Sequence, residues 1–205
     1  MENRRVVYIN KKLISKQYPD VDKQKLSNWY AFRPFTSEEL DEIQKLKQNL
    51  IFKTATISGK GKIDNSYRET RTGWIPDNDS TNWIYDRVLD CVITANEKLN
   101  WNFDIFGFYE LFQYAIYEKG AHYDWHMDAG VGKIARKISA TLQLSNEENY
   151  EGGSVVLKSN RDETPMSKKR GILTIFPSYL LHKVYPITSG QRESLVIWVS
   201  GPPFR

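Results

Sequence analysis

The 205-residue sequence has little cysteine, little histidine and no long apolar run. Its single cysteine, Cys91, excludes a disulfide within the chain and a zinc site built from several cysteines. No apolar stretch reaches the length of about 20 residues that a membrane-spanning helix needs. The first residues, MENRRVVYINKKL, contain no secretory apolar core. We therefore expect a soluble cytoplasmic protein without a membrane partner.

The sequence also has only a small excess of positive over negative charge. The formal net charge is only +4, from 29 basic and 25 acidic residues, and the basic residues are spread along the chain. Proteins that bind nucleic acid usually concentrate positive charge on one surface. We therefore do not expect a nucleic-acid partner, while the oligomeric state stays open.

Two segments in the first half of the chain have the apolar spacing of helices. In residues 35–50, Thr36 and Glu39 form the pattern of a capping box, and apolar residues recur at three- or four-residue intervals. Residues 80–100 show helical spacing over a longer stretch, which places Cys91 within a helix rather than at a nucleophilic site. We therefore expect two supporting helices before the main β region.

After Asn100 the sequence becomes a series of strand-length apolar runs separated by turn residues. Helices followed by many short strands predict a mostly β fold with flanking helices, and specifically a double-stranded β-helix, or jelly roll. We expect one domain over residues 1–205, in which residues 1–100 provide the helical support and residues 101–205 the jelly-roll core.

The segment YEKGAHYDWHMDAG contains two of the three histidines in the chain, His122 and His126. If the segment is extended, His126 and Asp128 project together, and so do His122 and Asp124, because alternate side chains of a strand share a face. Such a pair can bind one metal ion, and a distant histidine completes the facial triad that leaves three positions of Fe(II) open. His182 is the remaining histidine and the candidate third ligand. A structural histidine on a strand is the alternative, since His-x-Asp alone arises readily by chance.

A second group of residues follows His182 on a later strand. Arg192, Ser194, Val196 and Trp198 alternate and so share one face of that strand. An arginine that points into an apolar barrel needs a carboxylate partner, and its planar guanidinium suits a dicarboxylate ligand bound by two parallel hydrogen bonds. Ser194 is placed to add another hydrogen bond. A surface arginine on an edge strand is the alternative.

Together these residues resemble the Fe(II)- and 2-oxoglutarate-dependent dioxygenases, and within them the bacterial and viral members of the prolyl 4-hydroxylase-like branch. That branch carries the pattern Tyr-x-x-Gly-x-x-Tyr-x-x-His-x-Asp, followed by a distal histidine, a basic residue and a tryptophan. The resemblance covers roughly residues 80–205. The matching residues are Tyr117, Gly120, Tyr123, His126, Asp128, His182, Arg192 and Trp198.

The resemblance implies the cofactors Fe(II), 2-oxoglutarate and O2, with ascorbate as a candidate reductant. It makes His126, Asp128 and His182 the metal ligands. It leaves His122 and Asp124 at the rim of the pocket or on the surface.

The resemblance also assigns the co-substrate pocket. Arg192 pairs with the distal carboxylate of 2-oxoglutarate, Tyr117 offers its hydroxyl, Ser194 assists, and Val184 forms an apolar wall. On the strand RKISATLQLS polar and apolar residues alternate, and we expect the polar face to line this pocket. Gln143 is then a co-substrate contact, where relatives often place a tyrosine. A polar face turned toward solvent is the alternative.

The implied reaction is 4-hydroxylation of a prolyl residue in a peptide or protein with O2, which yields succinate and carbon dioxide. The loop GKIDNSYRETRTGW is expected to fold over the peptide and to supply Arg68, Arg71 and Trp74, while Tyr123 and Trp198 flank the proline. For Trp74, packing in the core is an equally good alternative. Other activities stay open: an oxygenase of the same superfamily that acts on another amino acid or demethylates nucleic acid, and a non-catalytic jelly-roll binding protein.

Overall fold

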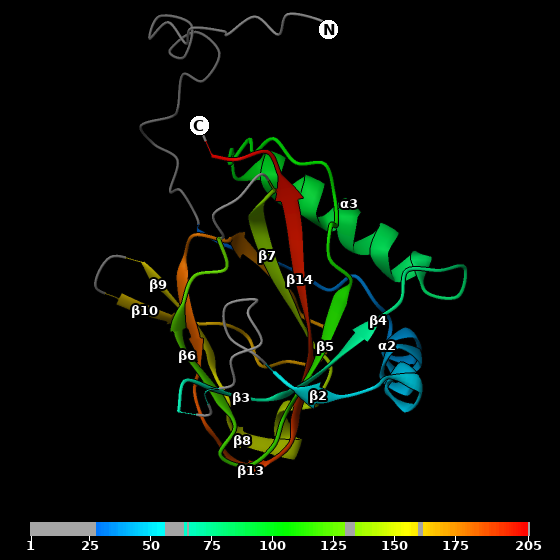
Figure 1. Ribbon diagram of the computed structural model, residues 1–205, viewed down its shortest axis with the longest axis vertical. Coiled ribbons are helices and arrows are strands. Elements are labelled where there is room, and N and C mark those ends of the chain that lie inside the picture. The colour runs from blue at the N-terminus through cyan, green and yellow to red at the C-terminus, as the bar shows by residue number, and fades with distance from the viewer. Residues whose placement is uncertain (1–27, 56–63, 65, 130–133, 160–161, 205) are drawn as a thin grey trace, which may run out of the picture.

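Two antiparallel sheets pack face to face in the computed structural model of the chain, shown in Figure 1. The structure describes residues 28–55, 64, 66–129, 134–159 and 162–204. The larger sheet has seven strands. In spatial order they are β1 (Tyr30–Phe32), β11 (Leu173–Pro177), β7 (Ala135–Gln143), β14 (Arg192–Gly201), β5 (Phe112–Tyr117), β4 (Arg71–Ile75) and β2 (Lys53–Thr54).

The smaller sheet has five strands, in the order β10 (Asp162–Pro165), β9 (Val155–Ser159), β12 (Leu181–Val184), β6 (His122–His126) and β3 (Arg68–Glu69). A separate two-stranded sheet joins β13 (Ile187–Gly190) to β8 (Tyr150–Gly152), and the 3-10 turn η3 (Glu147–Asn149) leads into β8. This mostly β architecture of facing antiparallel sheets confirms the jelly-roll fold predicted from the sequence.

The predicted capping box is confirmed at the start of helix α2 (Ser37–Lys45). The Glu39 backbone N–H donates to Thr36 Oγ1 at 3.3 Å, and the Thr36 backbone N–H donates to Glu39 Oε2 at 2.8 Å. These bonds satisfy two of the backbone donors that a helix start leaves without partners. Helix α2 continues into the 3-10 turn η2 (Leu46–Asn49).

Helix α2 and helix α3 (Asn82–Lys98) cover the side of the larger sheet that faces away from β6, β9 and β10, as Figure 1 shows. Their apolar side chains and those of the sheet form the main core. Among the described residues, no helix combines the length and the apolar character that crossing a lipid bilayer requires. The cytoplasmic location stays a prediction. Fully buried members of the main core include Ile43, Ile84, Val88, Leu142 and Leu195.

Strand β14 lies between β7 and β5, and its two faces have different surroundings. Leu195, Ile197 and Val199 belong to the main core under the helices. The intervening side chains line a cavity between the two sheets, as the alternation in the sequence predicted. These side chains are Arg192, Ser194, Val196 and Trp198.

Strands from the first half of the chain complete both sheets. β1, β2 and β4 belong to the larger sheet, and β3 pairs with β6 in the smaller one. The sheets therefore include residues on both sides of the boundary near residue 100 that the sequence pattern marked. The assignment of residues 1–205 to one domain stays a prediction.

Candidate metal centre and adjoining cavity

Three potential metal ligands converge between the two sheets. Strands β6 and β12 are antiparallel neighbours, and their register pairs His126 directly with His182. Asp128 follows β6, where its backbone N–H donates to the Ser178 carbonyl oxygen at 2.9 Å. Ligand atoms from the three residues all lie within 4.8 Å of one another. The three side chains are only 7–9% exposed, so a metal ion here would be shielded from bulk water.

Hydrogen bonds orient both imidazole rings of this cluster. His126 Nδ1 lies 2.7 Å from the Asp124 carbonyl oxygen, and His182 Nδ1 lies 2.9 Å from that of Leu180. Because a carbonyl oxygen only accepts, Nδ1 of each ring carries a proton and Nε2 is the atom available to a metal ion. The two Nε2 atoms, of His126 and His182, lie 3.9 Å and 3.4 Å from the carboxylate oxygens of Asp128.

Burial and charge set the protonation of the cluster. Burial lowers the pKa of His126 to about 3, so this ring is neutral at physiological pH. Burial acts in the same direction on His182, but the charge and hydrogen bonding of Asp128 outweigh it, and the pKa of His182 lies above its ordinary value. Burial would raise the pKa of Asp128, but His182 and the Ser139 hydroxyl, 2.7 Å from Asp128 Oδ2, hold it below its usual range. A metal ion that binds here replaces the proton of the His182–Asp128 pair.

A stack of an arginine and a tyrosine adjoins the first ligand. The Tyr123 ring lies nearly parallel to the His126 ring, with centroids 3.4 Å apart, and Arg68 Cζ is 4.5 Å from the Tyr123 centroid. Strand β3 places Arg68 there by pairing it with Tyr123, and Arg68 Nη2 donates to Gln113 Oε1 at 2.9 Å. Burial raises the pKa of Tyr123 to about 12, so its hydroxyl stays protonated. Two of the predicted substrate residues therefore lie beside the metal ligands and line the cavity.

Arg192 lines the same cavity, opposite Tyr117 in the register of β14 with β5. It is 2% exposed, burial lowers its pKa, and its Nε donates to Gln143 Oε1 at 3.0 Å. None of the ion pairs formed among the described residues includes Arg192. A buried guanidinium without a carboxylate partner is costly to the fold, so this one is suited to bind the carboxylate of a ligand.

The other predicted co-substrate residues lie around Arg192. The Tyr117 ring centroid is 5.2 Å from Arg192 Cζ, and Val184 and Ser194 line the cavity. The Ser194 hydroxyl is buried and has no hydrogen-bond partner within the described part of the chain. A buried hydroxyl without a partner costs about 1–3 kcal/mol, so a ligand oxygen beside it is favoured. Gln143 joins this group through its hydrogen bond to Arg192.

Trp198 and Trp74 lie near each other at the side of the cavity. Trp198 lines the cavity itself, and the Trp74 ring centroid lies 6.3 Å from that of Trp198. Trp74 also lines an adjoining groove together with Arg68. It is 43% exposed, so the structure does not place it in the core.

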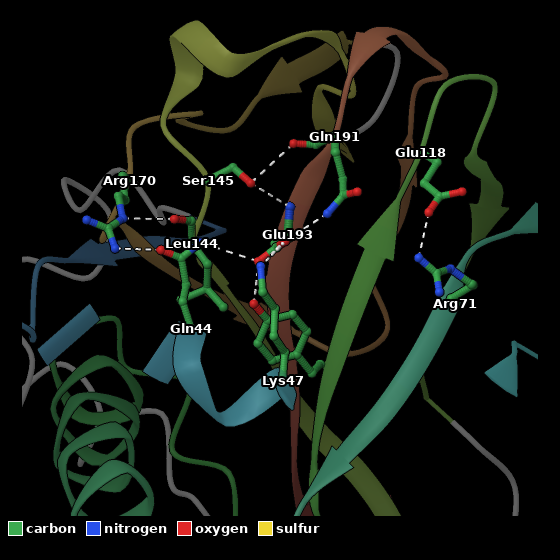
Figure 2. Close-up of polar contacts among 10 residues, drawn as sticks. Gln44, Lys47, Arg71, Glu118, Leu144, Ser145, Arg170, Gln191 and Glu193 are labelled. Atoms are coloured by element: carbon green, nitrogen blue, oxygen red, sulfur yellow. Dashed lines mark hydrogen bonds and ion pairs between the residues drawn. The ribbon is translucent and has the colours of Figure 1, made fainter. Parts of the chain in front are cut away.

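Arg71 lies elsewhere. Its Nη2 is 2.5 Å from Glu118 Oε1, and both side chains are at least half exposed (Figure 2). It borders a separate surface hollow with Glu118, so the structure does not bring Arg71 into the cavity. Residues 61–63 and 65 of the predicted substrate loop lie outside the described residues.

His122 and Asp124 do not join the ligand cluster. The His122 ring nitrogens lie 3.1 Å from the Gly120 carbonyl oxygen and 3.2 Å from that of Ser66. Asp124 is exposed, and its carboxylate accepts from the Trp125 backbone N–H at 2.8 Å. Both side chains therefore have backbone partners outside the ligand cluster, in keeping with a rim or surface position.

The polar face of β7 points inward. Ser139 and Thr141 line the cavity, whereas Ile138 and Leu142 pack in the main core. The alternation in the sequence predicted this orientation. The same alternation could have indicated a contact that was not predicted, the hydrogen bond from the Ser139 hydroxyl to the Asp128 carboxylate.

Arg136 is a site residue that the sequence pattern did not single out. Its Cζ lies 3.8 Å from the Trp198 ring centroid, and its Nη1 lies 3.9 Å from Asp128 Oδ1. Two hydrogen bonds to the Glu110 carboxylate, of 2.6 Å and 2.5 Å, hold the guanidinium in place. Strict alternation along β7 would turn Arg136 toward the helices, but the pairing of β7 with β14 shifts register beside it. Such a shift leaves no mark in the apolar pattern.

Comparison with known proteins shows what this chain is similar to. Residues 112–200 match the family model described as the 2OG-Fe(II) oxygenase superfamily. The PKHD-type hydroxylase of Shewanella baltica is 34% identical over 88 residues, which cover 40% of this chain and 39% of that protein. The match therefore spans less than half the length of that relative.

Two solved structures share the fold over most of their length. A Pseudomonas putida prolyl-4-hydroxylase has a TM-score of 0.66 and 19% identity, over 90% of this chain and 97% of that one. A prolyl hydroxylase from Trichoplax adhaerens, in complex with a hypoxia inducible factor oxygen degradation domain peptide fragment, has a TM-score of 0.70 and 18% identity, over 92% and 89%. The architecture is thus that of prolyl hydroxylases.

Residues 112–200, less than half of the chain, are thus similar to the 2OG-Fe(II) oxygenase superfamily, and the fold is similar to that of prolyl hydroxylases. This superfamily uses Fe(II), 2-oxoglutarate and O2. The residues present fit these groups. Two imidazole nitrogens and one carboxylate form a donor set that suits Fe(II), and the buried guanidinium of Arg192 suits a dicarboxylic acid.

Proposed function

We propose that this chain is an Fe(II)- and 2-oxoglutarate-dependent hydroxylase that acts at carbon 4 of a prolyl residue in a peptide or protein. The observation that supports it most is the buried cluster of His126, Asp128 and His182 in the same cavity as Arg192, a guanidinium without a carboxylate partner in the described chain. A non-catalytic jelly-roll binding protein has no need to keep all four groups together.

In this proposal the metal ligands have a single task. His126 Nε2, His182 Nε2 and one Asp128 oxygen hold the ferrous ion, and the hydrogen bonds of the two Nδ1 atoms and of Ser139 keep these ligand atoms in place. When bound, Fe(II), 2-oxoglutarate and O2 supply the oxidation of a substrate C–H bond, with release of succinate and carbon dioxide. The chain itself orients the reactants and excludes water, because the three side chains are almost fully buried.

Arg192 binds the distal carboxylate of 2-oxoglutarate through its planar fork of N–H groups. Tyr117 and Ser194 donate hydroxyl hydrogen bonds from the cavity wall, and Val184 contacts the aliphatic part of the co-substrate. Gln143 acts through Arg192, whose Nε it holds in one orientation. The arrangement selects a dicarboxylate because only a second carboxylate neutralises the buried guanidinium.

In the same proposal, a second group of residues binds the peptide substrate. Tyr123 and Trp198 line the cavity and contact the prolyl ring, and Arg136 lies over Trp198. Arg68 and Trp74 border the adjoining open groove, which receives the chain on one side of the proline. The peptide bound by the Trichoplax adhaerens neighbour supports a substrate of this kind.

The test uses the purified chain. Under anaerobic conditions, Fe(II) followed by 2-oxoglutarate should give a weak visible charge-transfer band, and Asp128→Ala should remove it. In air the chain should form succinate, and we expect added ascorbate to prolong this turnover. A chain that gives neither the band nor succinate would contradict the proposal.

The substrate is tested separately. In a peptide library, mass spectrometry should detect the gain of one oxygen atom in peptides that contain proline, and fragmentation should place it on that residue. Oxygen gained by peptides without proline would assign another amino acid as substrate. Demethylation of a methylated single-stranded oligonucleotide, with no change in any peptide, would assign the nucleic-acid alternative.

A further inference from the structure

A tyrosine outside the set assigned above lies in the apolar layer between the two sheets. Tyr150 begins β8 and is 3% exposed. Its ring belongs to the apolar cluster that includes Val155 and Val184, two residues that also line the cavity. Its hydroxyl makes no hydrogen bond of ordinary geometry within the described chain. A buried donor that stays without a partner destabilises the folded state, so its retention calls for a physical reason.

The backbone of β8 places this ring next to Arg192. Gly152 and Gly153 follow Tyr150 with φ values of +72° and +60°, where glycine is favoured. A Cβ atom at Gly153 would lie 3.3 Å from Arg192 Cδ and 3.3 Å from Tyr150 Cε2. The side chains of Tyr150 and Arg192 therefore both lie against Gly153. Arg192 also affects the pKa of Tyr150. Burial raises this pKa, and the positive charge of Arg192 opposes the rise.

We propose that Tyr150 is a further ligand for the distal carboxylate of 2-oxoglutarate, beside Arg192; this inference rests on the proposed function. In the bound state the phenol O–H donates to a carboxylate oxygen, and the phenol oxygen can accept from the guanidinium. Ser194, whose buried hydroxyl also lacks a partner among the described residues, donates from β14. One carboxylate then satisfies a buried cation and two buried hydroxyls at once.

Gln143 does not take this role. Its carbonyl oxygen Oε1 accepts from Arg192 Nε, so the amide holds the cation in place and does not neutralise it. Hydroxyl donors for a carboxylate at the guanidinium therefore come from other elements. Tyr150 on β8 and Ser194 on β14 both present a buried hydroxyl whose hydrogen has no acceptor among the described residues. The Tyr150 oxygen faces the guanidinium of Arg192.

A purely structural role for the ring is the competing explanation. Lys168 Nζ lies 4.3 Å from the Tyr150 ring centroid, and such a cation–π contact and the apolar packing both need the ring but not the hydroxyl. Tyr150→Phe keeps the ring and removes only the hydroxyl. This variant therefore separates the two explanations.

The experiment compares the full-length wild type with Tyr150→Phe, each loaded anaerobically with Fe(II). The dissociation constant of 2-oxoglutarate, measured by calorimetry, should rise about 10-fold in the variant, as for the loss of one charge-assisted hydrogen bond. The melting temperature without co-substrate should be unchanged or higher, because an unpaired buried group has been removed. Fe(II) affinity should not change.

Tyr85→Phe is the matched control, on the helix side of the larger sheet. The Tyr85 hydroxyl donates to the Ile75 carbonyl oxygen at 2.7 Å and accepts from the Phe112 backbone N–H at 2.9 Å. Its removal should lower the melting temperature and leave 2-oxoglutarate affinity unchanged. The same chemical change at the two tyrosines should thus have opposite consequences.

A truncated ligand gives an independent check. 2-Oxobutyrate keeps the keto acid and lacks the distal carboxylate, so wild type and Tyr150→Phe should bind it equally. If both ligands lose affinity to the same extent, Tyr150 acts by packing and the inference is wrong. Equal 2-oxoglutarate affinity of wild type and variant would also overturn it while leaving the proposed function intact, whereas a wild type that binds no 2-oxoglutarate would overturn both.

Discussion

Arg192 and Glu193 are neighbours in β14, yet they face opposite sides of the larger sheet and have opposite kinds of surroundings. Arg192 points into the cavity, where no ion pair of the described residues involves it. Glu193 points toward the helices and is 4% exposed. Its carboxylate accepts hydrogen bonds from four side chains, several of them visible in Figure 2: Gln44, Lys47, Tyr114 and Gln191.

The partners of Glu193 join the helical layer to the sheet. Lys47 Nζ lies 2.7 Å from one carboxylate oxygen, and Gln44 Nε2 lies 3.3 Å from the other, so α2 and η2 are both attached to β14. Tyr114 adds its hydroxyl from β5. Burial would raise the pKa of Glu193, but hydrogen bonds from Lys47 and Tyr114 outweigh it and hold the pKa below its usual range.

The comparison shows that burial alone does not identify a binding residue. Both charges are almost fully buried, and what separates them is whether the chain supplies the opposite charge. A buried charge that is fully hydrogen-bonded by its own chain contributes to the packing of elements. A buried charge that the chain leaves without a counter-charge is poised for a ligand. We extend this distinction to the two faces of the sheet: changes on the cavity face should affect ligand binding, and changes on the helix face should affect stability.

The largest effect is expected on the cavity side at the metal ligands. Asp128→Ala should abolish turnover and Fe(II) binding, because it removes the only carboxylate of the triad, as measured by succinate formation and by calorimetry with Fe(II). His122→Ala is the control, since both His122 ring nitrogens contact backbone carbonyls outside the cluster. If His122→Ala were as inactive as Asp128→Ala, the register assigned to the ligands would be wrong.

Arg192→Ala should have the next largest effect. The dissociation constant of 2-oxoglutarate should rise on the order of 100-fold, the usual range for a truncated partner of a buried charge pair. Fe(II) affinity should persist, and the melting temperature should hold, because no internal ion pair among the described residues is lost. Calorimetry and thermal unfolding would check both points. If Arg192→Ala unfolds while Glu193→Ala stays stable, the assignment of Arg192 to ligand binding and of Glu193 to stability would be wrong.

Ser139→Ala tests the support of a metal ligand. Loss of the hydrogen bond to Asp128 Oδ2 should lower Fe(II) affinity about 10-fold, a typical effect for a group that orients a ligand. Thr141→Val is the paired control, since Thr141 lines the same face of β7. Equal losses of Fe(II) affinity in the two variants would show that the polarity of the face matters rather than the bond to Asp128.

The smallest effect is expected on the helix face and depends on pH. Glu193→Gln should lower the free energy of unfolding by about 1–2 kcal/mol at neutral pH and leave 2-oxoglutarate affinity unchanged. Because the pKa of Glu193 is lower in the folded state than its ordinary value of 4.5, the ionised group stabilises the fold above that pH. This contribution is lost as the pH falls through the folded pKa. Urea unfolding at a series of pH values should therefore show the difference from wild type shrinking in acid, and a constant difference would contradict the assignment.

Features that depend on near neighbours in the chain were predictable. The capping box of Thr36 and Glu39 is a contact over three positions, and the inward face of β14 follows from alternation along one strand. His126 and Asp128 could be grouped for the same reason. Each of these predictions needed only the geometry of one element.

The partners of two arginines could not be predicted from the local sequence. Arg71 and Arg136 look alike as local sequence, but Arg71 pairs with Glu118, 47 positions away, and Arg136 with Glu110, 26 positions away. The first pair lies on the surface. The second places a guanidinium over the ring of Trp198, which lines the cavity. The partner of a long charged side chain is set by strand pairing, so the predicted substrate role of Arg71 had no local pattern to test it against.

The sequence by itself determined which groups are available: two His-x-Asp pairs, a single further histidine, and an arginine on the alternating face of a late strand. These depend only on residue identity and spacing. Only the tertiary structure decided that His126 lies opposite His182, that Glu193 has its donors while Arg192 has no carboxylate among the described residues, and that Tyr150 packs beside Arg192. The physical reason is that strand register and contacts between distant segments, not local propensity, set which buried polar groups meet.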